Sequence, residues 1–132
     1  MLNQMFLTMK KVIATPDAPK AVGPYSQAIE VNGTLYISGQ IPVNPADGKV
    51  QEDIVDAAHQ SLKNIGAILK EAGMTYDNVV KTTVLLADIA DFKAVNEVYA
   101  EYFTGDKPAR ACYQAAALPL GVKVEIEAIA VR

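Results

Sequence analysis

The sequence predicts an α+β sandwich in which one sheet carries both helices on a single face. Two segments have a helical apolar period, residues 53–72 and 91–103, and strand-like runs lie before, between and after them. The strands carry apolar residues on both faces, whereas two helices can cover only one. The second face therefore needs a partner, and we expect the chain to self-associate.

Size and charge place limits on domain number and partners. With 132 residues, 51% of them hydrophobic, residues 9–132 are expected to form one domain preceded by an extension at residues 1–8. A net charge of -3 without a Lys/Arg cluster disfavours binding to nucleic acid or to an anionic membrane. The single cysteine, Cys112, suits a reducing, cytoplasmic compartment, and with one histidine, His59, we predict no metal site.

The first third of the chain predicts short strands and turns. A strand at residues 10–14 ends before Pro16, and residues 22–27 form an irregular loop. Strands at residues 28–31 and 34–38 flank Asn32-Gly33, a strong signal for a two-residue hairpin. A turn follows at residues 44–48.

The first helix is predicted over residues 53–72. Asp53 suits its N-cap and Gly73 its left-handed C-terminal residue. Apolar residues recur at steps of three and four: Ile54, Ala58, Leu62, Ile65, Leu69 and Ala72. His59 falls on the polar side of this helix and is expected to be solvated surface.

Residues 79–86 are apolar on both faces and predict an interior strand. The second helix begins near Asp91 and ends before Gly105. Its apolar stripe is assigned to the core: Phe92, Val95, Tyr99 and Tyr102.

The stretch from 108 to 127 combines two strands with unexpected charges. Arg110, Cys112 and Gln114 should point to one face of their strand. In the second strand, residues 124, 126, 128 and 130 look like a core face, which leaves Glu125 and Glu127 together on the other. These charges either neutralise each other in a structural ion pair or line a cleft.

Five segments carry a family resemblance: Gly-Pro-Tyr-Ser-Gln-Ala at 23–28, Ile-Ser-Gly-Gln-Ile-Pro at 37–42, Lys-Thr-Thr-Val at 81–84, Pro-Ala-Arg-Ala-Cys at 108–112 and Val-Glu-Ile-Glu-Ala at 124–128. In order, across residues 9–132, they resemble the motifs of the RidA/YjgF/UK114 family, the reactive-intermediate (enamine/imine) deaminases. The resemblance implies a chorismate-mutase-like fold with a mixed sheet, and a homotrimer with three clefts between subunits. It also implies cofactor-free hydrolysis of 2-imino acids to 2-keto acids and ammonia.

The resemblance also assigns site residues. Arg110 falls on the carboxylate-binding arginine, Glu125 on the water-positioning glutamate and Tyr25 on the cleft tyrosine. Further cleft positions fall on Ser38, Gly39, Asn96 and Cys112. A planar guanidinium suits bidentate capture of a carboxylate, and Glu125 beside an arginine should be ionised at neutral pH. For Glu127 we expect a structural ion pair.

The favoured function is therefore deamination of short 2-imino or 2-enamino acids such as 2-iminobutyrate and 2-aminoacrylate. A second hypothesis is a non-catalytic module that senses 2-keto acids through the same arginine. A third is a ribonuclease or translation inhibitor, against which the acidic composition argues.

Overall fold

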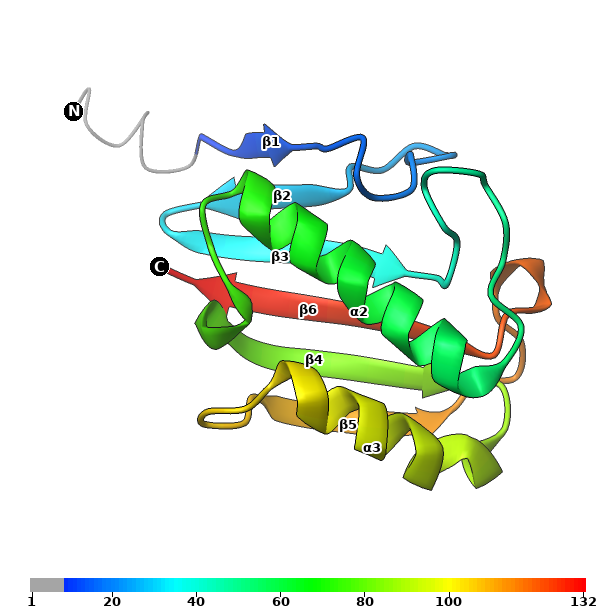
Figure 1. Cartoon of the computed structure of the whole chain (residues 1–132). Helices are drawn as coiled ribbons and strands as arrows, with labels where there is room; N and C mark the ends of the chain where they lie inside the picture. Colours follow the sequence, from blue (N-terminus) through cyan, green and yellow to red (C-terminus); the bar gives the residue numbers. More distant parts are fainter. Residues whose placement is uncertain (1–8) are drawn as a thin grey trace.

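The computed structural model describes residues 9–132, so the expected extension at residues 1–8 lies outside the described part of the chain. Its single sheet has the strand order β1-β2-β3-β6-β4-β5 (Figure 1). The strands are β1 (Lys11–Ile13), β2 (Ala28–Val31), β3 (Thr34–Gln40), β4 (Val79–Leu86), β5 (Ala109–Gln114) and β6 (Val124–Val131). Neighbours are antiparallel except β4 and β5, which run parallel, so the sheet is mixed.

Both helices lie on the same face of the sheet, as the sequence predicted (Figure 1). They are α2 (Ile54–Glu71) and α3 (Phe92–Tyr102). The parallel β4–β5 pair requires a crossover, and α3 supplies it. Short 3₁₀ turns complete the fold: η1 (Tyr76–Asn78), η2 (Ile89–Asp91) and η3 (Pro119–Gly121). The α+β class is confirmed.

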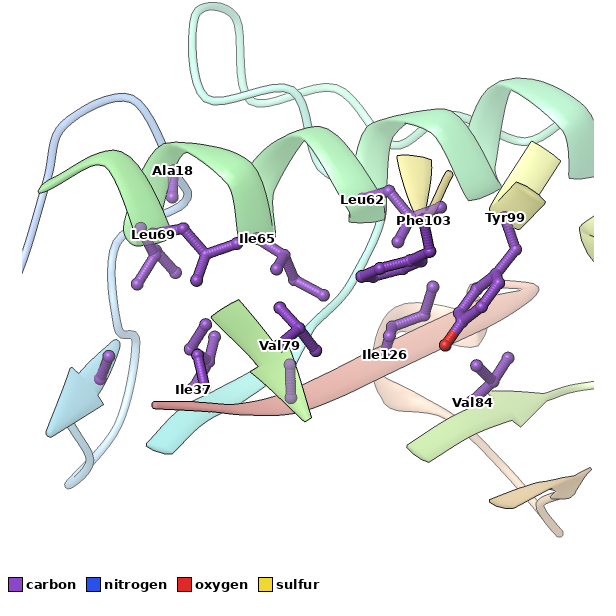
Figure 2. Close-up of a cluster of buried hydrophobic side chains, with 14 of the residues drawn as sticks. Ala18, Ile37, Leu62, Ile65, Leu69, Val79, Val84, Tyr99, Phe103 and Ile126 are labelled. Atoms are coloured by element: carbon purple, nitrogen blue, oxygen red, sulfur yellow. The ribbon is translucent and has the colours of Figure 1, made fainter. Parts of the chain in front are cut away.

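The predicted ends of α2 are confirmed. The side chain of Asp53 accepts hydrogen bonds from the first-turn backbone N–H groups, and Gly73 has a φ of 73°. Between these ends, Leu62 and Ile65 are fully buried. Figure 2 shows them pointing toward Ile126 and the sheet, where they form the centre of the core.

The hairpin between β2 and β3 is also as predicted. Asn32 and Gly33 have φ angles of 50° and 80°, which is the conformation of a type I′ turn. At its other end β3 extends to Gln40, beyond the predicted end at Ser38. Its pairing with β6 becomes irregular after Ile37, so Ser38 and Gly39 lie in a bulged segment.

His59 corrects one expectation about α2. It is half-buried, and its Nδ1 shares a hydrogen bond of 2.7 Å with the Oη of Tyr102 on α3. The helical period places His59 on the polar side of α2, but it does not reveal that α3 packs beside that side. The ring therefore joins the two helices and is not merely solvated surface.

The sheet face opposite the helices, here called the open face, has no described element packed on it. Directly paired residues share a face, so Tyr36 of β3, Thr83 of β4 and Glu127 of β6 belong to the open face. Large exposed apolar side chains include Tyr36 and, on β5, Tyr113. Across residues 9–132, neither helix has the length and apolar character of a membrane span.

Candidate functional site

Arg110 lies on β5, at the edge of the sheet, and points toward α3. Its register partner on β4 is Thr82, whose buried side chain faces the helices. The Nη1 of Arg110 donates a hydrogen bond of 2.8 Å to the Oδ1 of Asn96 on α3. The carbon of the guanidinium lies 4.9 Å from the ring centroid of Tyr99 and 5.5 Å from that of Phe92.

Cys112 follows on the same face of β5, as the alternation predicted, and packs against the core. Burial raises the pKa of its thiol, while Arg110 acts in the opposite direction with the smaller effect. The neutral thiol is a poor nucleophile, which favours a lining role over a catalytic one. We call Arg110, Asn96 and Cys112 the arginine group.

Glu125 lies on the open face, because its register partner on β4 is Leu85, one residue away from the helix-facing Val84 and Leu86. Its carboxylate rests directly on the backbone of Gly39. A Cβ added at Gly39 would lie only 2.0 Å from the Oε2 of Glu125. A glycine is therefore required at this position to leave room for the carboxylate.

Ser38 and Tyr25 lie beside this pair. The hydroxyl of Ser38 donates a hydrogen bond of 2.6 Å to the carbonyl oxygen of Ser26, which ties β3 to the loop that carries Tyr25. The Tyr25 side chain is half-exposed, and it lines a cavity of about 340 Å³ together with Gly39. We call Tyr25, Ser38, Gly39 and Glu125 the glutamate group.

Gln27 organises the same loop, although its place in the sequence motif did not predict this role. Its buried amide accepts a hydrogen bond from the Thr15 N–H and donates to the carbonyl oxygens of Thr15, Ala18 and Pro19. These bonds tie the backbone of residues 15–19 to Gln27, two residues after Tyr25. The signal that could have found it is a glutamine at the start of an apolar strand, where a polar side chain must be satisfied.

The two groups lie on opposite faces of the sheet, which rules out, within one chain, the structural ion pair that was one of the two alternatives for Arg110. Within residues 9–132, neither Glu125 nor Glu127 forms a salt bridge, so the structural pair expected for Glu127 is wrong. Glu125 is not beside an arginine in its own chain. Burial raises its pKa above the ordinary 4.5, and the neighbouring Glu127 raises the pKa further. The arginine expected beside Glu125 is therefore not supplied by the same chain.

Phe92 corrects another expectation, since its ring is 40% exposed and does not belong to the core. Tyr99, in contrast, is buried as predicted. The helical stripe identified both residues but could not show that Arg110 lies against them.

The spacing of the strands prevents one small ligand from touching both groups in one chain. β6, which carries Glu125, lies two strands from β5, which is roughly 10 Å at about 4.8 Å per strand. In addition, the sheet separates the two faces. In a 2-imino acid the carboxylate and the imine carbon are joined by one bond, so a second copy of the chain must bring the two groups together if they act on one molecule.

The described residues also bear on metal binding. Nowhere in residues 9–132 do three His, Cys, Asp or Glu side chains gather closely enough to hold a metal ion.

Comparison with known proteins yields one family and many relatives. The model of the family described as Endoribonuclease L-PSP matches residues 15–132. A mouse protein named 2-iminobutanoate/2-iminopropanoate deaminase is 59% identical over 94% of this chain and 93% of its own. Reactive Intermediate Deaminase A, chloroplastic, from Arabidopsis thaliana is 55% identical over 92% of this chain and 65% of its own.

Solved structures agree with these relatives. The structure of E. coli TdcF with bound serine has a TM-score of 0.90 and 45% identity, covering 92% of this chain and 98% of that one. The E. coli YjgF gene product has a TM-score of 0.90 and 48% identity, with the same coverage of both chains. The fold predicted from the motifs is confirmed.

Proposed function

The chain belongs to the Endoribonuclease L-PSP family, which is the RidA/YjgF family, and from this premise we propose that it is a 2-iminobutanoate/2-iminopropanoate deaminase. The observation that carries the proposal is Arg110, whose guanidinium contacts α3 and forms no salt bridge with a carboxylate of residues 9–132. Such an arginine is suited to bind the carboxylate of a small substrate.

The reaction adds water across a C=N bond. Arg110 binds the substrate carboxylate, while Tyr25 and the backbone near Gly39 orient the imine. Glu125, as its carboxylate, accepts a hydrogen bond from a water molecule and directs the oxygen lone pair to the imine carbon. The resulting carbinolamine loses ammonia and leaves the 2-keto acid. Imines hydrolyse slowly in water already, so positioning and electrostatics suffice and no cofactor is needed.

A single cysteine supports a reducing compartment, the cytoplasm.

The proposed assembly is a homotrimer in which the arginine group of one subunit faces the glutamate group of its neighbour. The separation of the two groups within one chain and the apolar side chains on the open face support this arrangement. Light scattering on the purified protein is expected to give the mass of three chains. A stable, active monomer would contradict the assembly and the shared site.

The test of function measures keto acid release from 2-iminobutanoate and 2-aminoacrylate generated in the cuvette, against a buffer blank. A rate above the blank supports the proposal. Binding of 2-oxobutanoate without any such rate would instead support a keto acid sensor. Cleavage of RNA with no effect on imines would favour the activity after which the family is described.

The raised pKa of Glu125 makes a prediction about pH. A carboxylate that must be ionised loses activity as the pH falls through its folded-state pKa, and burial and the neighbouring Glu127 raise this pKa for Glu125 in the single chain. Glu127→Gln removes one of the two causes of this shift, so the acid limb of kcat/KM should move to lower pH while activity at neutral pH is retained. The pH profiles of both proteins check this, and an unmoved limb would show that Glu125 does not set it.

A further inference from the structure

Three side chains on one stripe of α3 surround the guanidinium of Arg110. Phe92, Asn96 and Tyr99 are four and three residues apart, so they lie on the same side of the helix. Asn96 accepts the hydrogen bond from Nη1, and both rings lie within the 6 Å at which a cation interacts with an aromatic face. Among the described residues, no hydrogen bond from Nε or Nη2 is present, which leaves the edge suited to a carboxylate available.

The ring of Tyr99 is itself fixed to the sheet. Its hydroxyl shares a hydrogen bond of 2.7 Å with the Oγ1 of Thr82, the register partner of Arg110 on β4. Its other neighbour is Phe103, whose ring centroid lies 4.5 Å away. These contacts hold the ring of Tyr99 in place beside the guanidinium of Arg110.

Phe92 is placed by a different set of contacts. It is the first residue of α3, directly after η2. The N–H of Ile89 in η2 donates a hydrogen bond of 2.9 Å to the side chain of Gln114 on β5, the strand that carries Arg110. The start of α3 is thus tied to β5. A phenylalanine that is 40% exposed contributes little to the core, so its contact with the guanidinium is its distinctive feature.

We infer that Phe92 and Tyr99 are positioning residues that, with Asn96, hold the Arg110 guanidinium in the orientation that binds the substrate carboxylate. A free arginine side chain samples many rotamers. Ordering it at each binding event costs conformational entropy and would lower the affinity for the carboxylate. The two rings restrict the guanidinium before the ligand arrives. The consequence of this inference for catalysis rests on the proposed function. The ordering of the Arg110 side chain does not depend on that function.

Phe92→Leu tests the inference, because leucine keeps an apolar side chain and removes the aromatic face. We expect KM for 2-iminobutanoate, and the dissociation constant for 2-oxobutanoate, to rise by about three- to tenfold with kcat little changed. Phe92→Tyr keeps an aromatic face over the guanidinium, so its KM should be close to that of the wild type. The control is Tyr102→Leu, which removes a ring of the same helix whose hydroxyl and ring contact His59 and Tyr76 instead of Arg110; it should lower Tm and leave KM unchanged.

A second readout does not depend on catalysis. In NMR relaxation measurements, the Nε–H group of Arg110 should be ordered in the wild type and more mobile in Phe92→Leu. Equal order in the two proteins would overturn the inference, as would a Phe92→Leu variant that lowers Tm without changing the affinity for 2-oxobutanoate. A wild type that shows an ordered, Phe92-dependent Arg110 but hydrolyses no imine would instead contradict the proposed function and leave the positioning role intact.

Discussion

Arg110→Ala is expected to abolish measurable imine hydrolysis while leaving the protein folded and assembled. The side chain is half-exposed on an edge strand, and its only hydrogen bond within the described chain goes to Asn96. Removing the Arg110 side chain therefore removes the group that binds the substrate carboxylate and leaves the packing of the core unchanged. Arg110→Lys keeps the charge but loses the two-pronged geometry, so we expect at least about a tenfold loss, or roughly 1.4 kcal/mol of transition-state stabilisation.

The measurements are initial rates of keto acid formation, thermal unfolding and light scattering on each variant. Arg132 supplies a matched control, since it is the other arginine of the chain and forms a two-pronged pair with Glu30, at 2.7 and 3.0 Å. Arg132→Ala should lower Tm and leave kcat/KM unchanged, the opposite pattern. An Arg110→Ala protein that unfolds, or one that keeps its activity, would show that the guanidinium serves the fold.

Glu125→Gln is expected to reduce kcat by at least about a hundredfold, which is the range for the loss of a general base. The amide has nearly the same shape, so it fits beside Gly39, but it cannot accept a proton from the attacking water. Binding of 2-oxobutanoate should persist, because Arg110 is unchanged. Calorimetric titration with the keto acid, alongside the rate assay, separates the two effects.

Glu127→Gln is the control for this change, because Glu127 lies on the same face of β6 two residues away. It should remain active at neutral pH. If Glu125→Gln kept most of its activity, another group would have to position the water. If it lost its affinity for 2-oxobutanoate together with its activity, Glu125 would be needed for ligand binding and not for water alone.

Local patterns predicted the elements of this fold well, because each depends on residues close in sequence. The Asn32-Gly33 turn has the positive φ angles that its residues favour, and Asp53 and Gly73 mark the two ends of α2. The alternation along β5 and β6 placed Arg110 with Cys112, and Glu125 with Glu127. The five motifs predicted the family, which the relatives confirm.

By itself, then, the sequence determined the order and type of the elements, the residues that share a face within each strand, and the family. Only the tertiary structure decided which face each set occupies. Arg110 turns toward α3 and Glu125 toward the open face, since β5 pairs parallel with β4 in a register that aligns Arg110 with Thr82. Alternation fixes side chains relative to their own strand, but the covered face depends on where a distant helix packs. Within one chain Glu125 and Arg110 are therefore separated, and burial raises the pKa of Glu125.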